Sequence, residues 1–240
     1  ISKIKHGHRD QIQNCAVEII NIGEFPYPPK QYGPDICFVP IVDYLFKQYP
    51  NIRRVLVCDA FDTVFQGDPF TTYITSDMLY FTSENVTFSK STINRRWVRA
   101  LPIPNPSFDW KKPIINTGHI MGDPSLVLQF FDIFFSLYNP SDPKKSYSHD
   151  QAYMNYIIHS GYLEKNNIPY LISPPHESCI ALALKARNLM ESQKFLGNVL
   201  TSASDGYARL IHQFDRLPAL RRDVVERCPQ GNYPVTDFLR

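Results

Sequence analysis

Short apolar segments separated by turn-forming residues recur along the chain. They are rich in β-branched and aromatic residues and too short for typical helices, which favours buried β-strands. The predicted strands comprise residues 16–22, 53–58, 79–82, 170–172 and 208–211. A loop rich in proline and tyrosine, at residues 26–34, follows the first of them.

Other apolar residues recur at helical spacing between these strands. Ile41, Tyr44, Leu45 and Tyr49 share one face of a predicted helix whose first turn contains Pro40. Strands that alternate with helices favour an α/β domain with a central, mainly parallel sheet.

Two further helices carry recognisable start and stop signals. Asp123 is a good N-cap and Pro124 a good first residue for a helix whose apolar run covers residues 126–137. Ser148 begins another helix, which Gly161 ends. By contrast, residues 84–113 are polar, basic and rich in proline, and they predict a long loop of the kind that usually serves a function.

Composition limits the class of protein. The 240 residues include 43% hydrophobic residues, enough for a sizeable core, and neither an internal repeat nor a linker divides them, so a single domain over residues 1–240 is expected. With 25 basic against 23 acidic residues, the chain does not have the concentrated positive charge of a nucleic-acid-binding protein. No apolar run is long enough for a transmembrane helix. The five cysteines form no C-x-x-C pair, so a structural zinc site is not expected.

Two acidic residues follow the second predicted strand. Asp59 and Asp62 come directly after the apolar residues 55–58. Ligands of open α/β sheets bind beyond the carboxyl ends of the strands, and carboxylates there can hold Mg²⁺ or Mn²⁺ with positions left for phosphate oxygens. The alternative interpretation is an acidic turn after a core strand.

Three later segments also contain residues that could take part in chemistry. The first is the turn Asn116-Thr117-Gly118-His119, whose glycine allows close approach to the backbone, although such turns are common. The second is Ser148-His149-Asp150-Gln151, in which Asp150 could face a reacting group or could simply belong to a capping box. The third contains His212, a candidate metal ligand or a structural histidine.

Taken together and in this order, these segments resemble the GT-A fold of glycosyltransferases. The similarity is to an uncharacterised eukaryotic group in the nucleotide-diphospho-sugar transferase superfamily with a D-x-x-D-x-x-F-Q-x-D-P-F motif. Here that motif is the run from Asp59 to Phe70, and the similarity continues at Ile115-Asn116-Thr117-Gly118, Asp150-Gln151 and His212-Gln213-Phe214-Asp215-Arg216, so it covers roughly residues 16–216.

The resemblance implies a GT-A-like three-layer α/β/α sandwich and a metal-assisted glycosyltransferase. It implies a Mn²⁺ or Mg²⁺ site, a nucleotide-diphosphate sugar as donor, for which UDP-sugars are the commonest in this fold, and a glycan, protein or lipid acceptor. Carried over by position, the implied metal ligands are Asp59, Asp62 and His212, the last as in glycogenin-like enzymes. Asn116, Thr117 and Gly118 would line the donor sugar, and Asp150 and Gln151 would lie near its anomeric carbon.

Two basic residues complete the expected site. Arg95 and Arg96, within the predicted loop at 84–113, could close over the diphosphate and exclude water. Asp150 would serve either as the base for an acceptor hydroxyl or as a stabiliser of positive charge at the sugar carbon.

The resemblance also sets expectations about the whole protein. Residues 1–14 predict a polar helix or loop, so the first strand of a GT-A domain has no counterpart here, and the chain is expected to be a fragment of a longer protein. The Golgi or another secretory compartment is the expected location, and the single sequon Asn85-Val86-Thr87 is compatible with it.

Two rival functions remain open at this stage. A phosphatase of the haloacid-dehalogenase type also places acids after an apolar strand, but its two aspartates are separated by one residue, whereas two residues separate Asp59 from Asp62. The other rival is an inactive protein of the same fold that only binds a nucleotide sugar or a protein partner.

Overall fold

The structure is a computed structural model. It describes residues 38–59, 62–70, 77–103, 108–137, 149–174, 180–182, 208–218 and 220–222. The predicted strand at 16–22, the loop at 26–34 and the polar segment at 1–14 lie outside these residues. The single-domain organisation stays a prediction.

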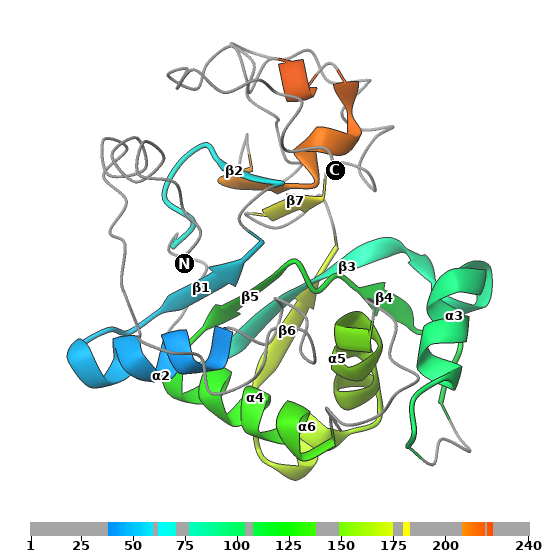
Figure 1. The fold of residues 1–240 in the computed structure, drawn as a ribbon, viewed down its shortest axis with the longest axis horizontal. Helices are drawn as coiled ribbons and strands as arrows, with labels where there is room; N and C mark the ends of the chain where they lie inside the picture. The colour runs from blue at the N-terminus through cyan, green and yellow to red at the C-terminus, as the bar shows by residue number, and fades with distance from the viewer. Residues whose placement is uncertain are drawn as a thin grey trace, which may run out of the picture.

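The larger sheet has five strands in the order β1-β5-β3-β4, with β6 also paired to β3 (Figure 1). Strands β1, β3 and β6 run in one direction, while β4 and β5 run in the other, one after the other along β3. The bounds of these strands are β1 (Val55–Cys58), β3 (Leu79–Thr87), β4 (Pro113–Ile115), β5 (His119–Gly122) and β6 (Tyr170–Ser173).

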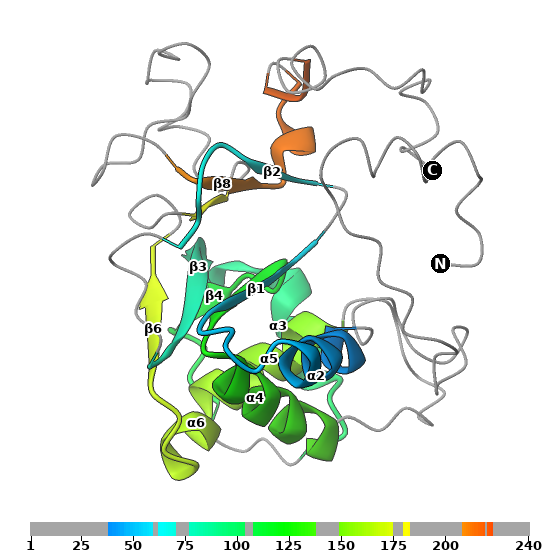
Figure 2. The same ribbon diagram turned by 90° about the vertical axis from the view of Figure 1, so that its left-hand side faces the viewer.

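Helices cover one face of this sheet (Figures 1 and 2). The apolar core lies between them: Phe81 of β3 packs on Phe130 of α4 with ring centroids 5.5 Å apart, and Ile157 of α5 is fully buried in the same cluster. The helices are α2 (Phe38–Gln48), α3 (Thr92–Arg99), α4 (Pro124–Leu137), α5 (His149–His159) and α6 (Tyr162–Lys165). The predicted α/β class, with a central sheet flanked by helices, is confirmed.

A second, three-stranded sheet lies on the other face of the larger one (Figure 2). Its strands are β2 (Thr63–Phe65), β8 (Leu210–His212) and β7 (Ile180–Leu182), in the order β2-β8-β7. Leu210 of β8 packs in one buried cluster with Tyr80 of β3 and Met121 of β5. Among the described residues, the layer on this second face is therefore a small sheet, and it brings the end of β8 over the larger sheet.

Local signals set the observed helix boundaries. The Asp123 carboxylate accepts hydrogen bonds from the backbone N–H groups of Ser125 (2.8 Å) and Leu126 (3.3 Å), which confirms it as the N-cap of α4. Gly161 follows α5 with φ of 77°, a left-handed conformation that glycine adopts without strain.

The prediction of a loop over residues 84–113 was wrong. Strand β3 continues to Thr87, and a 3₁₀ turn (Phe88–Lys90), α3 and β4 follow it. The sequence pattern missed α3 because this short helix buries only Asn94 and Val98 fully, and three of its eight residues are arginines. Tertiary packing stabilises this segment instead. The ring of Phe88 packs edge-on against that of Phe108, with ring centroids 5.0 Å apart.

Asn155 on α5 connects that helix to the larger sheet. Its side chain accepts a hydrogen bond from the Ile115 N–H (2.7 Å) and donates to the Ile115 carbonyl (2.8 Å), and it is fully buried. Replacing Asn155 by alanine is expected to lower the free energy of unfolding by about 1–3 kcal/mol, because both backbone groups lose their partner away from water. Urea denaturation measures this; an unchanged midpoint would contradict the assignment.

No helix among the described residues has the length and apolar character needed to cross a membrane.

Of the cysteines, Cys58 is the one that the described ranges include, and it forms no disulfide. Burial, with the charges of Asp59 and Asp62, raises the pKa of its thiol to about 11. Cys58 is therefore a protonated, unreactive thiol near neutral pH.

Candidate active site

Three elements bring Asp59, Asp62 and His212 together. Asp59 directly follows β1, and its N–H donates to the Gly118 carbonyl (2.9 Å). Asp62 directly precedes β2, and His212 is the last residue of β8. Because β2 and β8 pair with Thr63 opposite His212, the histidine lies beside the acidic segment although it is far away in sequence.

The side chains of these three residues point to one place. His212 Nδ1 is 3.3 Å from Asp62 Oδ1, and His212 Nε2 is 3.9 Å from Asp59 Oδ2. One ligand atom from each residue can be chosen so that all lie within 4.8 Å of one another. The imidazole is buried, whereas the Asp59 side chain is 43% exposed, so the cluster opens to solvent on the Asp59 side.

The donor set fits a divalent cation. Ligand atoms lie about 2.0–2.6 Å from a divalent ion, so two ligands of the same ion are at most about twice that distance apart. The ligand atoms of Asp59, Asp62 and His212 meet this condition. Carboxylates and imidazole are both ligands of divalent metal ions, and the exposed side leaves coordination positions for a further ligand. The cluster predicted from the sequence can therefore hold a metal ion.

Opposite charges around Asp62 keep it ionised. Burial acts to raise the pKa of its carboxyl, but the hydrogen bond and charge of His212 and the charge of Arg216 outweigh burial and hold the pKa below its usual value. The Arg216 guanidinium lies 4.0 Å from the Asp62 carboxylate and 3.2 Å from that of Asp215. The carboxylate form, which metal binding requires, is thus present well below neutral pH.

Gly118 packs directly against His212 in the cluster formed by Asp59, Asp62 and His212. A Cβ at this position would lie 2.1 Å from His212 Nε2, which no real contact allows. The Gly118 N–H is satisfied by the Asn116 side chain (3.0 Å), and Asn116 in turn donates to Glu84 (3.4 Å). Glycine is therefore needed here because the imidazole occupies the space of a side chain.

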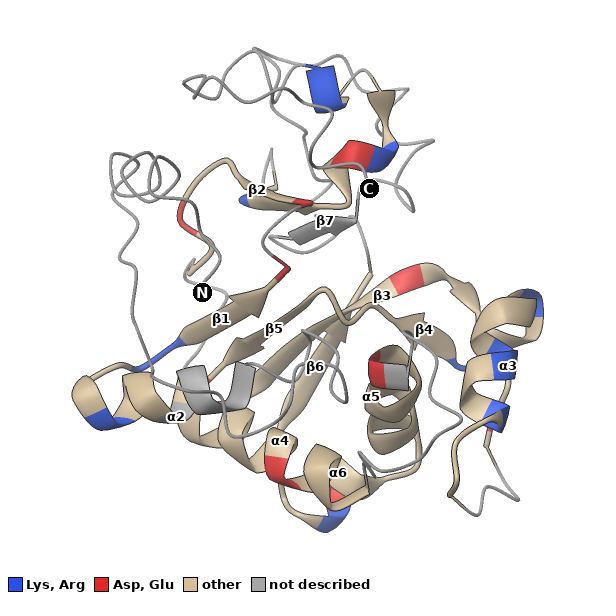
Figure 3. Ribbon diagram, in the orientation of Figure 1, with Lys and Arg blue, Asp and Glu red and all other residues tan. Residues whose placement is uncertain are grey.

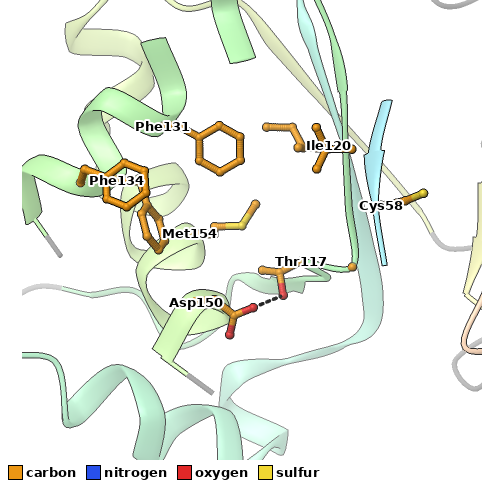
Figure 4. A pocket seen from close by; sticks show the side chains of 10 residues that line it. Cys58, Thr117, Ile120, Phe131, Phe134, Asp150 and Met154 are labelled. Carbon is orange, nitrogen blue, oxygen red and sulfur yellow. Dashed lines mark hydrogen bonds between the residues drawn. The ribbon is translucent and has the colours of Figure 1, made fainter. Parts of the chain in front are cut away.

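The preceding residue, Thr117, connects the same turn to α5. Its Oγ1 lies 3.3 Å from Asp150 Oδ2 and 3.4 Å from Gln151 Oε1 (Figure 4). Gln151 also donates to Asn94 of α3 at 2.7 Å. The single turn 116–118 therefore contacts both the predicted metal ligands and the predicted catalytic pair.

The environment of Asp150 raises the pKa of its carboxyl. Burial raises the pKa of the carboxyl, the backbone of Gln151 and the Thr117 hydroxyl lower it, and the charge of Asp59 raises it; the net shift is upward. Because the charge of Asp59 adds to the rise in this pKa, the carboxylates of Asp59 and Asp150 are close enough to interact electrostatically. An aspartate with a raised pKa is better suited to accepting a proton than an ordinary one.

Behind the turn, the space between sheet and helices is narrow. A cavity of about 20 Å³ lies between Thr117, Asp150, Phe131 and Phe134, room for about one water molecule (Figure 4). The Cys58 side chain points away from these phenylalanines. The cavity is therefore too small for a ligand larger than a water molecule.

The two predicted basic residues lie apart from this cluster. Arg95 and Arg96 belong to α3, at the far end of the sheet from β1 (Figure 3). The Arg95 guanidinium donates to the Ser89 carbonyl (3.0 Å) and Thr92 Oγ1 (3.4 Å). Among the described residues, no hydrogen bond or ion pair joins either arginine to Asp59, Asp62 or His212, or to residues 116–118. Their role at a diphosphate stays a prediction.

The structure brings His119 to the site, a residue that the sequence named as part of the turn at 116–119 but to which it assigned no role. His119 follows Gly118 and is 1% exposed, and its ring lies edge-on to that of His212 with centroids 6.3 Å apart. Burial, with the charge of His212, lowers the pKa of His119 to about 3. Its position directly after the turn was the only signal in the sequence.

No protein-family model and no curated protein matches this chain. Among solved structures, the chain is similar to a glycosyltransferase involved in the glycosylation of the major capsid of PBCV-1. The two share 12% sequence identity, and the similarity covers 83% of this chain and 81% of that chain with a TM-score of 0.45.

Proposed function

We propose that this chain is the catalytic domain of a glycosyltransferase that moves a sugar from a nucleotide-diphosphate donor, a UDP-sugar in the first instance, to an acceptor hydroxyl. The observation that supports this most directly is the convergence of Asp59, Asp62 and His212 beside a turn that also contacts Asp150. The order of these segments, with the motif from Asp59 to Phe70, resembles GT-A glycosyltransferases.

The three convergent side chains would hold Mn²⁺ or Mg²⁺ at the exposed end of the cluster. The chemistry that such an ion supplies is Lewis-acid stabilisation of the negative charge on a departing diphosphate. The described residues contribute orientation: Gly118 allows His212 to approach the backbone, and Arg216 keeps Asp62 in place by its charge. The open side next to Asp59 leaves room for phosphate oxygens.

Asp150 would act on the acceptor. Its carboxylate, held by the Thr117 hydroxyl, would take the proton of the attacking hydroxyl, and its raised pKa makes it a stronger base for this step. Gln151, which connects Thr117 and Asn94, would keep the N-terminus of α5 against the turn.

The proposal is tested by screening nucleotide sugars against the full chain with and without Mn²⁺. A bound donor should raise the melting temperature, by the equivalent of about 2.7 kcal/mol at a hundredfold excess over Kd, and EDTA should remove the effect. Release of the nucleoside diphosphate measures turnover. Metal-dependent binding without turnover would favour a binding-only protein, and hydrolysis of a generic phosphomonoester would favour a phosphatase.

Replacing Thr117 by valine is expected to shift the pH dependence of kcat/KM. The hydrogen bond from Thr117 lowers the pKa of Asp150, so its loss should raise that pKa further. Because the base must be ionised, activity should be lost at a higher pH in the variant than in the parent as the pH falls. The pH profile of kcat/KM measures this, and an unshifted acidic limb would contradict the role of Asp150.

We also propose that the protein acts in the Golgi or another secretory compartment. Asn85, the sequon residue, lies on β3 with its side chain exposed, so an oligosaccharide could be attached there. Expression through the secretory pathway should yield a glycosidase-sensitive form, and Asn85→Gln should remove it. A chain secreted without modification at Asn85 would count against this location.

A further inference from the structure

The imidazole of His212 lies against two successive residues, Gly118 in the turn before β5 and His119 at the start of β5. Gly118 faces it so closely that a Cβ would come within 2.1 Å of Nε2. The ring of His119 lies edge-on to it, with an angle of 65° between the ring planes and 6.3 Å between centroids. The orientation of His212 is therefore limited by Gly118 and by His119, together with Thr63, whose Oγ1 lies 3.3 Å from His212 Nδ1.

The ring of His119 is itself fixed by β3. Its Nε2 shares a hydrogen bond of 2.9 Å with Thr82 Oγ1, and both side chains are buried. Its Nδ1 is buried and has no hydrogen-bond partner within the described part of the chain. An unpaired buried polar atom is destabilising, and a phenylalanine of similar size would avoid this cost. An imidazole at this buried position therefore indicates that His119 has a role besides filling space.

We propose that His119 is a positioning residue, which holds the His212 imidazole with Nε2 towards Asp59 and Nδ1 towards Asp62. This inference rests on the proposed metal-dependent function. A rotation of the His212 ring would move carbon atoms into the places of the two nitrogens and break the cluster. The Thr82–His119 pair opposes that rotation because the His119 ring occupies the space beside His212.

Removing a group that positions a metal ligand lowers the affinity of the site for its metal ion by a measurable factor. Loss of a partner that orients a metal-binding histidine typically lowers affinity by about 10–100-fold. We therefore expect His119→Ala to bind Mn²⁺ at least about 10-fold more weakly than the parent. Thr82→Val, which retains the shape of the threonine but not its hydroxyl, should lower the affinity less, since the His119 ring remains but is free to turn.

The matched control is His159→Ala. His159 is also a mostly buried histidine with a hydrogen bond, to the Pro113 carbonyl (2.8 Å), but it lies among the aromatic rings of Phe88 and Phe108. Its loss should lower the melting temperature and leave Mn²⁺ affinity unchanged. Electron paramagnetic resonance of free Mn²⁺ measures the affinity of each variant.

A second measurement separates this inference from the metal site itself. The ring signals of His212 in metal-free NMR spectra should change in His119→Ala and stay unchanged in His159→Ala. If the parent binds no Mn²⁺ but those signals still change, the metal proposal fails and the packing role of His119 stands. If His119→Ala binds Mn²⁺ as the parent does, or the His212 signals do not change, the positioning role is overturned.

Discussion

Replacing Asp62 by alanine is expected to reduce metal-dependent sugar transfer by on the order of a hundredfold or more. The substitution removes one of the three ligands and also the carboxylate that contacts His212 Nδ1 at 3.3 Å. A metal that stabilises charge in the transition state contributes several kcal/mol, and each 1.36 kcal/mol is about tenfold in rate. The measurement is release of the nucleoside diphosphate at saturating Mn²⁺, together with Mn²⁺ affinity.

The control for this variant is Asp132→Ala. Asp132 is an exposed aspartate on α4, outside the cluster, so the same change of charge should leave both activity and Mn²⁺ affinity near those of the parent. Equal activity of Asp62→Ala and the parent would show that Asp62 is not a ligand and would remove the three-residue site.

Gly118→Ala is expected to have the second largest effect, because a methyl group would occupy the place of His212 Nε2. The imidazole must move away, so Mn²⁺ affinity and turnover should both fall by at least about 10-fold. Forced overpacking also costs about 1–3 kcal/mol of stability. Mn²⁺ titration and urea denaturation of the same preparation measure the two effects.

Two further variants separate the clash from a general loss of stability. Gly161→Ala puts a side chain at φ of 77°, where the nearest atom to its Cβ would be 3.8 Å away; it should cost about 1–2 kcal/mol and leave the metal site intact. Adding His212→Ala to Gly118→Ala makes room for the methyl group, so the losses of stability should be less than additive. Strict additivity would contradict the predicted contact.

Periodicity and local chemistry were enough to predict most of the described elements. The apolar segments ending at Cys58 and beginning at Leu79 are strands, although the second continues to Thr87. Asp123 caps α4 and Gly161 ends α5, since capping depends on a few neighbouring backbone groups. Helices α3 and α6 and strands β2, β4, β5 and β7 were not predicted because they are short, and packing rather than local preference fixes them.

The sequence by itself placed two aspartates after a buried strand and a histidine late in the chain, and the resemblance to GT-A glycosyltransferases implied that Asp59, Asp62 and His212 are metal ligands. What only the tertiary structure decided is their convergence: the pairing of β2 with β8 places His212 between Asp59 and Asp62. The role of Gly118 as space for the imidazole, and the contact of His119 with it, were also invisible in the sequence. Contacts between residues distant in sequence depend on how whole strands pair and pack, which no local pattern specifies.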